Sequence, residues 1–475
     1  MKDRTMTATT ANLSSAHHLR FADEMRATLR LAAPIAAAQI AQIGMGTTDT
    51  VLLGGLGRDA LAAGGLGAML FFTILSLLQG MVSAVSILVA HARGAGDESR
   101  IAPALRAGVL VATCAALPLM AVLSQAETIL RAVHEPAALA AAVSPYERIL
   151  LWGTLPAMWM AVQRAYLAAM DRPQLIMTVT VTALIMNGFL NYGLMHGAFG
   201  LPNMGYVGSA MASAITLWCQ MGATAVGMGR ILALKRFRLW GTVEWPLVRE
   251  LLHLGWPIAI TIGVETMLFF AGGLLMGIVG ATALAAHQIS LNVAALMFMV
   301  PLGIGQAANV RVGYHTGAGA HRAARRAALA AFTLGIMFAM VSASVMVGAP
   351  RRIALLFGLN LANPADAEVI ALAARLLLIA AAFQLADGLQ TIASGILRGL
   401  KDTRTPMILA AIGYWIFGFP TAWVLGLHFG FGAIGVWVGL AFSLVMAALM
   451  LVSRFWIMSG RAIAADAAKP LAAQI

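Results

Sequence analysis

The sequence is poor in charge and almost free of cysteine. Of its 475 residues, 11% are Asp, Glu, Lys or Arg and 60% are hydrophobic, which excludes an ordinary soluble protein. The two cysteines, Cys114 and Cys219, cannot build a disulfide framework or an ordinary metal site, and we interpret them as small core residues. The first thirty residues lack the short apolar core of a cleavable signal peptide, so we expect no cleavage there.

Catalytic motifs are missing as well. The sequence contains no Gly-Lys-Ser/Thr phosphate loop, no His-Glu-x-x-His and no Gly-x-Ser-x-Gly. The stretch Gly430-Phe-Gly432-Ala-Ile-Gly435 has the spacing of a dinucleotide fingerprint, but it joins two hydrophobic runs and no strand precedes it. We therefore expect neither an enzyme nor a bound cofactor.

Long hydrophobic runs are what the sequence does have. A helix needs roughly 20 apolar residues to cross a membrane. Twelve runs have about this length, at 31–53, 68–90, 107–124, 149–170, 175–195, 206–228, 255–279, 283–306, 328–348, 371–397, 406–427 and 432–453. The expected fold class is an all-α membrane protein with twelve transmembrane helices.

Lys and Arg are spread unevenly over the loops between these runs. With the N-terminus inside, the inner segments hold 25 of the 31 Lys and Arg residues and the outer segments hold six. Because positive residues concentrate in cytoplasmic loops, we expect both termini in the cytoplasm. The net charge of +12 then reflects topology and contact with anionic lipids, and no nucleic-acid partner is expected.

The two halves of the chain repeat one pattern. The segment Leu31-Ala-Ala-Pro34-Ile-Ala36 aligns with Leu254-Gly-Trp-Pro257-Ile-Ala259, and Gly205-Tyr-Val-Gly208 resembles Gly432-Ala-Ile-Gly435. Six spans in each half give both halves the same orientation, so we expect two parallel repeats with the substrate cavity between them. The expected parts are a cytoplasmic segment at 1–30, an N-terminal lobe at 31–228, a basic linker at 229–250, a C-terminal lobe at 251–455 and a cytoplasmic tail at 456–475.

Three of the nineteen acidic residues fall inside long apolar runs: Asp49, Glu265 and Asp387. A carboxylate at membrane depth is costly unless it faces a cavity, a partner or an ion, so it marks a functional site by default. Two carboxylates surrounded by amide and hydroxyl oxygens suit a proton or a small cation such as sodium, and Glu265 and Asp387 are the candidate ligands. Polar residues expected to converge on this pair are Gln288, Asn292, Gln384, Gln390 and Thr391.

The N-terminal half has its own polar group around Asp49. Gln42 lies two turns before Asp49 on the first run, and Asn187 and Asn191 lie one turn apart on the fifth. The spacing places both asparagines on one helix face. An alternative interpretation puts Asp49 near the outer surface, without a functional role.

These residues resemble the multidrug and toxic compound extrusion (MATE) family, most closely its NorM-like bacterial branch. The resemblance covers about residues 20–455. It rests on Pro34…Gln39…Asp49-Thr50-Val51, on Gly255-Trp256-Pro257-Ile258…Glu265, on Ala285-Ala286-His287-Gln288-Ile289 and on Phe383-Gln384-Leu385-Ala386-Asp387-Gly388-Leu389-Gln390.

The resemblance implies two six-helix lobes in a V shape and antiport of organic cations and other drugs against sodium ions or protons. It implies that Glu265 and Asp387 bind the coupling ion, and that Asp49 lines the cavity of the N-terminal lobe. The implied partners are small cationic, amphipathic drugs and membrane lipids, for a monomer in the bacterial inner membrane.

Two positions depart from the family pattern. Some members have a tyrosine one turn before the second acid, where this chain has Phe383. Certain relatives have an additional acid near the position of Asn191, so proton chemistry in this lobe would depend on Asp49 alone. The phenolic oxygen missing at Phe383 leaves the choice between sodium and protons open.

Competing functions make different demands on the sequence. A flippase for lipid-linked glycans, from the same superfamily, would need a strongly basic central cavity, whereas the central spans here are acidic and rich in amides. A membrane-embedded hydrolase or transferase would need a nucleophile or a metal cluster at membrane depth. A scaffold without transport activity would leave three acids at membrane depth unexplained.

Overall fold

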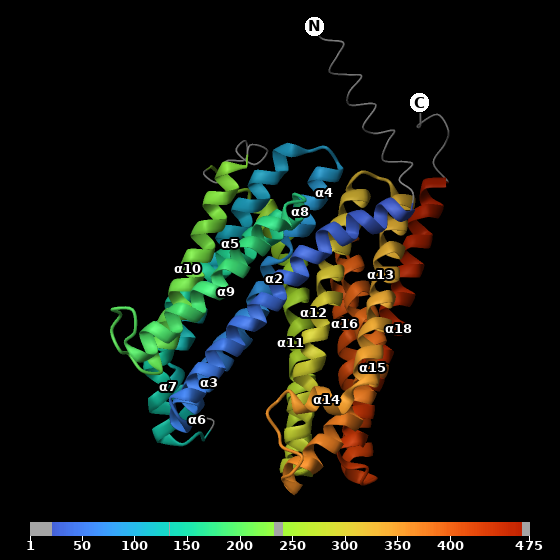
Figure 1. The fold of residues 1–475 in the computed structure, drawn as a ribbon. Helices are drawn as coiled ribbons and strands as arrows, with labels where there is room; N and C mark the ends of the chain where they lie inside the picture. The colour runs from blue at the N-terminus through green and yellow to red at the C-terminus, as the bar shows by residue number, and fades with distance from the viewer. Residues whose placement is uncertain (1–20, 133, 232–240, 468–475) are drawn as a thin grey trace. The chain divides into compact units, whose positions relative to one another are not determined.

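The computed structural model describes residues 21–132, 134–231 and 241–467, and helices make up most of them, with no strand in these ranges (Figure 1). The longer helices of the first half are α2 (Phe21–Gly55), α3 (Arg58–Val82), α4 (Val85–Gly94), α5 (Ile101–Ser124), α7 (Ala137–Leu150), α8 (Thr154–Ala169), α9 (Pro173–His196) and α10 (Val207–Arg230). Those of the second half are α11 (Trp245–Val279), α12 (Ala281–Gly317), α13 (His321–Gly348), α15 (Pro364–Gly399), α16 (Arg404–Ala411) and α18 (Gly432–Ala467).

Short elements complete the helical segments. These are η1 (Glu98–Arg100), α6 (Ala126–Ala132), η2 (Leu151–Gly153), α14 (Pro350–Leu355), α17 (Phe419–Trp423) and two π-helical stretches, η3 (Ile412–Gly418) and η4 (Val424–His428). The helices α7 and α8 are joined by η2 and form one continuous span. The helix α16 continues through η3, α17 and η4 and forms another.

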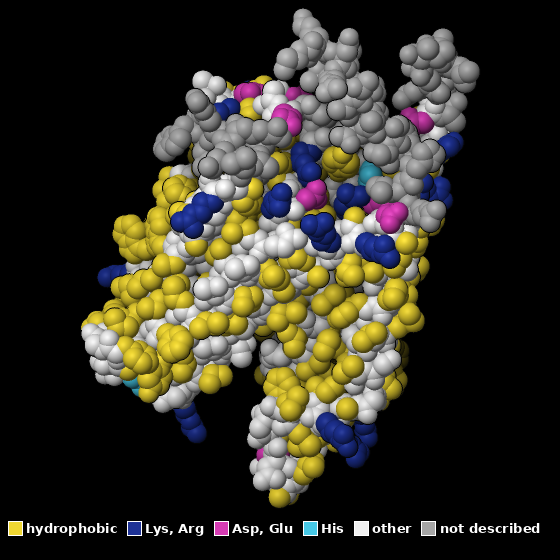
Figure 2. All heavy atoms as spheres, turned by 45° about the horizontal axis from the view of Figure 1, so that its top comes forward, with side chains coloured by type: hydrophobic (Ala, Val, Ile, Leu, Met, Phe, Trp, Pro, Cys, Tyr) yellow, Lys and Arg dark blue, Asp and Glu magenta, His cyan; other side chains and the backbone are white. Residues whose placement is uncertain are grey.

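The twelve expected spans agree with this helix order. Within the described residues, nine helical segments are long and apolar enough to cross a membrane. The other three spans correspond to α2, to α7 with α8, and to α10. The α2 helix contains Gln and Thr, and α10 contains Gln, Ser and Thr, which lower their hydropathy. The span formed by α7 and α8 contains the charged residues Glu147, Arg148 and Arg164. Figure 2 shows broad hydrophobic surfaces on the helices, with Lys and Arg gathered near their ends.

The helices form two compact units. The N-terminal unit contains the described residues of Ala37–Val89 and Asp97–Ala259, and the C-terminal unit contains those up to Ala36, Ala90–Gly96 and from Ile260 onward. The chain therefore changes units within α2, between Ala36 and Ala37, and within α11, between Ala259 and Ile260. Between these points it also enters and leaves the C-terminal unit for the short stretch Ala90–Gly96. Ala36 and Ala259 are equivalent positions in the sequence repeat. The lobe boundaries expected from the sequence stay a prediction.

Equivalent glycines make equivalent contacts in the two repeats. Gly205 and Gly432 both adopt positive φ, 59° and 57°, which favours glycine. A Cβ added to Gly208 would lie 2.7 Å from the carbonyl oxygen of Leu194, and one added to Gly435 would lie 2.5 Å from that of Leu425. Both glycines thus allow a helix to pack against the end of the preceding one, and this shared geometry confirms the duplication.

Small residues also position the helix that carries Asp387. The helices α12 and α15 pack against each other, and a Cβ on Gly395 would clash with the backbone of Gly305. Backbones that approach this closely are typical of helix packing in membranes. On its other faces α15 packs against α13 and α18, and the large buried side chains of Trp437 and Tyr414 belong to the same core. Asp387 is therefore held on a tightly packed helix.

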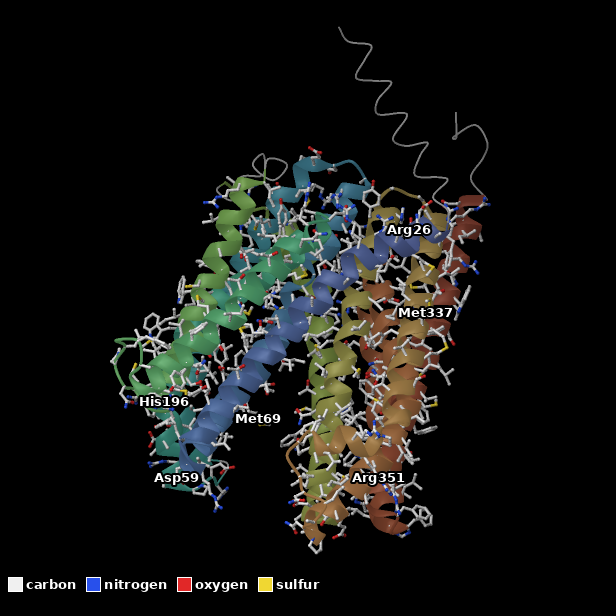
Figure 3. The ribbon with its side chains drawn as sticks, in the orientation of Figure 1. Arg26, Asp59, Met69, His196, Met337 and Arg351 are labelled. Carbon is white, nitrogen blue, oxygen red and sulfur yellow. The ribbon has the colours of Figure 1, made fainter. Side chains whose placement is uncertain are left out.

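The ends of each unit can be followed in Figure 3. Arg26 and Arg351 lie at opposite ends of the C-terminal unit, with Met337 between them. The charge pattern assigns Arg26 to the cytoplasmic side and Arg351 to the outer side, and this orientation stays a prediction.

Candidate functional site

In the N-terminal unit, Asp49 lies at the centre of a buried polar cluster. One carboxylate oxygen of Asp49 accepts a hydrogen bond from Nδ2 of Asn191 at 2.7 Å, and the other accepts one from Oγ of Ser213 at 3.0 Å. Asp49 is buried, as are Asn191 and Ser213. Helix packing therefore encloses the carboxylate of Asp49, while its depth in the membrane and its role stay predictions.

The second asparagine extends this cluster. Nδ2 of Asn191 also donates to the backbone carbonyl of Asn187 at 3.2 Å, and Nδ2 of Asn187 lies 3.5 Å from Oγ1 of Thr216. The side-chain oxygens of Asn187 and Asn191 are buried and make no hydrogen bond within the described residues. The same holds for Oε1 of Gln42, which is also buried and accepts no hydrogen bond from a described residue. These oxygens are therefore available as acceptors for a ligand, although Gln42 does not hydrogen-bond to Asp49.

Sequence analysis missed the contribution of α10. Ser209, Ser213, Thr216, Gln220 and Thr224 are all buried and follow one another at intervals of three or four residues. That spacing places them on one helix face. A polar stripe with helical periodicity was thus readable in the sequence, and it would have identified Ser213 as a partner for a buried acid.

In the C-terminal unit, one amide joins the two expected acids. Nε2 of Gln390 donates to Oε1 of Glu265 at 3.1 Å and lies 3.4 Å from Oδ1 of Asp387. It also lies 3.3 Å from Oγ1 of Thr391. Glu265 comes from α11 and the other three from α15, so residues of two helices meet at this amide.

A tyrosine that the sequence did not single out completes this cluster. The hydroxyl of Tyr414 donates to Oε1 of Gln390 at 2.8 Å, and Tyr414 is fully buried. It belongs to the π-helical stretch η3, and such stretches frequently occur at functional sites. Phe383 contributes no hydroxyl here and packs against Trp437 with ring centroids 5.7 Å apart.

Three other expected residues do not hydrogen-bond to the acids. Gln288 and Asn292 are exposed on α12, where Nδ2 of Asn292 donates to the backbone carbonyl of Gln288 at 2.8 Å. Gln384 is buried, and neither polar atom of its side chain has a hydrogen-bond partner within the described residues. Roles for these three residues in the substrate cavity stay predictions.

The structure also encloses a carboxylate that sequence analysis overlooked. Glu147 is fully buried, and neither carboxylate oxygen has a hydrogen-bond partner in the described part of the chain. The expected fourth span began at residue 149, which left Glu147 in a loop. Because α7, η2 and α8 run on as helix from Ala137 to Ala169, Glu147 lies inside the packed span.

The two clusters share one chemical design. In each, a side-chain amide donates to a buried carboxylate; in the N-terminal unit a serine hydroxyl donates to the carboxylate as well, whereas in the C-terminal unit the tyrosine hydroxyl donates to the amide. In the C-terminal unit two carboxylates share one amide donor, so a proton or a small cation would relieve their mutual repulsion. The described residues contain no group of three or more His, Cys, Asp and Glu side chains that could hold a metal ion. Binding of sodium would therefore depend on the two carboxylates together with neutral oxygens.

Comparison with known proteins agrees with this architecture. The MatE family model matches residues 34–193 and again residues 257–424, once in each repeat. The multidrug resistance protein NorM of Burkholderia vietnamiensis is 48% identical over 439 residues, which are 92% of this chain and 95% of that protein. The probable multidrug resistance protein NorM of Bradyrhizobium diazoefficiens is 43% identical over 456 residues, 93% of this chain and 95% of that protein.

Solved structures share the fold. The eukaryotic MATE transporter AtDTX14 matches with a TM-score of 0.83 at 20% identity, over 93% of this chain and 98% of that chain. An outward-facing multidrug resistance MATE family transporter of the MOP superfamily matches with a TM-score of 0.82 at 18% identity, over 92% and 96%. With a family match in each repeat and near-complete alignment to the NorM proteins, this chain belongs to the MatE family, in its NorM-like branch.

Proposed function

We propose that this protein is a secondary active multidrug efflux transporter that exchanges drugs for sodium ions or protons. The observation that carries the proposal is the pair of acids, Glu265 and Asp387, bridged by the amide of Gln390 in the C-terminal unit. The NorM relatives are named multidrug resistance proteins, which supports multidrug efflux. Because they belong to the same family as this chain, we assign the same activity to it.

The mechanism follows from competition for negative charge. A buried carboxylate cannot stabilise a coupling cation and a cationic drug fully at the same time, so binding one opposes binding the other. Each ligand then favours the conformation in which it makes better contacts. Transport of the ion and transport of the drug are therefore coupled. Asp49 supplies a second buried charge, and we assign it to recognition of cationic drugs.

Membrane location and topology belong to the same proposal. We place the protein in the bacterial inner membrane with both termini in the cytoplasm, on the basis of the 25-to-6 division of Lys and Arg. A monomer would suffice, since each unit contains its own buried acidic cluster.

Transport by reconstituted protein tests the proposal directly. Dye efflux from proteoliposomes, measured with a sodium gradient and a proton gradient imposed separately, should depend on at least one of them. Glu265→Gln and Asp387→Asn should each abolish gradient-driven efflux, because they remove the charge but keep the shape of the side chain. Asp59→Asn is a matched control, since Asp59 is an exposed residue at the start of α3. Wild-type rates in both acid variants at equal expression would eliminate this pair as the coupling site.

A further inference from the structure

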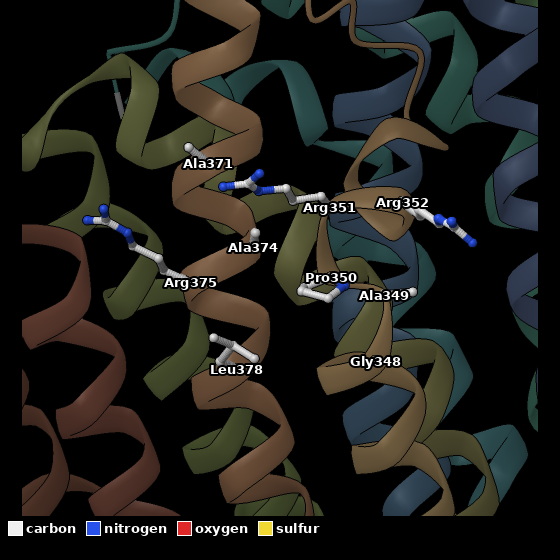
Figure 4. A pocket seen from close by; sticks show the side chains of 9 residues that line it. All are labelled: Gly348, Ala349, Pro350, Arg351, Arg352, Ala371, Ala374, Arg375 and Leu378. Atoms are coloured by element: carbon white, nitrogen blue, oxygen red, sulfur yellow. The ribbon is translucent and has the colours of Figure 1, made fainter.

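A pocket of about 420 Å³ lies between the end of α13, the short helix α14 and α15 of the C-terminal unit (Figure 4). Three of the six Lys and Arg residues assigned to the outer side of the membrane line it: Arg351, Arg352 and Arg375. The floor is apolar and includes Ala374 and Leu378. The pocket thus combines concentrated positive charge with an apolar base, at the end of the unit opposite Arg26.

None of these arginines has a charged partner. All three are exposed, and the described residues provide no hydrogen bond or ion pair to their guanidinium groups. The acids that begin α15 do not neutralise them, since Asp366 accepts from the backbone N–H of Asn360 and Glu368 forms no ion pair with any described residue. A cluster of unpaired arginines favours an anionic ligand such as phosphate.

The three side chains are not equivalent. Figure 4 shows Arg351 reaching across α15 between Ala371 and Ala374, while Arg352 points away to the opposite side of α14. Arg375 leaves α15 one turn after Ala371. Arg351 and Arg375 are therefore the candidate ligands, and Arg352 is a natural control for charge alone.

Below the pocket, exposed apolar side chains continue along both helices. On α13, Val345 and Val341 follow Gly348 at intervals of three and four residues, which places them on the same helix face. On α15, Leu378 and Leu385 continue the face of Ala371. The helices α13 and α15 pack against each other, and each carries exposed apolar side chains that follow its part of the pocket lining along the helix.

We propose that this pocket binds the phosphate of an anionic phospholipid, such as phosphatidylglycerol, with Arg351 and Arg375 as its ligands. The acyl chains would lie on the apolar surface formed by α13 and α15, which a free phosphate would leave uncovered. An arginine within the first turns of a span can extend to the headgroup layer, as Arg375 would do here. The site also accounts for arginines on the side of the membrane that the charge rule otherwise keeps poor in positive charge.

Photo-crosslinking tests the site in the full-length protein. The purified transporter is mixed with phosphatidylglycerol or phosphatidylcholine carrying a photoactivatable group in an identical acyl chain, and adducts on residues 341–348 and 371–385 are quantified by mass spectrometry. Wild-type protein should give more adduct with phosphatidylglycerol. Arg351→Gln and Arg375→Gln should each lower that yield about fivefold, the effect of one positive charge near an anionic lipid. Arg352→Gln should leave the yield nearly unchanged.

Several results would overturn the proposal. These are equal yields from both lipids in the wild type, an equal loss in Arg352→Gln, or displacement of the lipid by an excess of inorganic phosphate, which would indicate a free-anion site. Arg351→Lys and Arg375→Lys keep the charge and should retain most of the preference. If a glutamine variant fails to fold, the lysine variants test the site in its place. Loss of the preference for phosphatidylglycerol in a lysine variant would also contradict a site that depends on charge.

Discussion

At the scale of single residues, Gln390 is the most constrained polar group in the C-terminal cluster. Its amide nitrogen lies within hydrogen-bonding distance of both acids, and its oxygen accepts from Tyr414. A glutamine amide in this setting cannot rotate freely, because exchanging its two ends would present an acceptor to the carboxylates. Tyr414 therefore fixes the orientation of the group that holds both acids.

Removing the hydroxyl of Tyr414 should weaken coupling. In Tyr414→Phe, Gln390 loses the donor that orients it, and a hydrogen bond of about 1 kcal/mol corresponds to roughly a fivefold loss. We expect gradient-driven efflux from proteoliposomes to fall by about that factor with folding preserved. Tyr206→Phe is the control, because the hydroxyl of Tyr206 donates only to the backbone carbonyl of Ala142 in the N-terminal unit. An equal loss in the two variants would contradict a specific role for Tyr414.

The charge of Asp49 should matter most for cationic drugs. An enclosed negative charge gains more from a positive ligand than it would in water. Asp49→Asn should weaken the binding of cationic compounds such as ethidium by about 1–3 kcal/mol. Resistance to these compounds should therefore fall by more than resistance to neutral ones. Dye efflux and growth inhibition in a host without its own pumps would measure the difference. If both classes lose equally, Asp49 has no role in substrate recognition.

At the scale of helices, the N-terminal turns of α2 are attached to the end of α12. The carboxylate of Glu24 accepts from Arg311 at 2.8 Å and lies 2.9 Å from Nε2 of His315. Glu24 and His315 are buried, and Arg311 is mostly so. Glu24 precedes the expected first span, and burial raises its pKa while His315 and Arg311 lower it by more, so the net pKa is below the ordinary 4.5. This cluster holds the start of α2 within the C-terminal unit.

This ion cluster should give the protein an acid-sensitive stability. Because the pKa of Glu24 is lower in the folded state, its stabilisation is complete above about pH 4.5 and is lost as the pH falls through the folded value. Glu24→Gln should lower stability by about 3–5 kcal/mol at neutral pH, since Arg311 is left without its partner, and should flatten the acid response. Thermal unfolding in detergent across a pH series measures both effects.

The exposed pair Glu127 and Arg131 is a matched control for this prediction. It is also a pair of a glutamate and an arginine, but it lies within one helix, and its two side chains are 35% and 54% accessible to solvent. Glu127→Gln should change stability by less than about 1 kcal/mol. A similar loss in both variants would show that Glu24 acts only as a surface charge.

At the scale of the whole molecule, the topology can be tested by chemical labelling. In a variant without Cys114 and Cys219, cysteines introduced at positions 2, 237 and 470 should resist an impermeant thiol reagent in intact cells. These three positions lie outside the described residues and in segments assigned to the cytoplasm. Leu361→Cys, in the exposed turn before α15, should be labelled. Reaction from outside at any of the first three positions would disprove the twelve-span topology.

Much of this architecture was readable in the sequence, because a membrane restricts what a chain can do. Every backbone polar group must be satisfied within the span, so a hydrophobic run of sufficient length can only form a helix. The same cost made Asp49, Glu265 and Asp387 stand out, and all three lie in polar clusters of the structure. The shared glycines Gly208 and Gly435 likewise revealed the duplication before their packing was known.

Partners contributed by separate helices could not be read in the same way. Ser213 and Tyr414 lie far along the chain from the acids that they serve, and only helix packing brings them close. Glu147 was missed because the start of its helix depends on packing as well as on hydropathy. Local periodicity specifies which residues share one face of a helix, whereas contacts between helices depend on how all the spans pack together. The spans and their buried acids were therefore determined by the sequence itself, and the groups that hold those acids were decided by the tertiary structure.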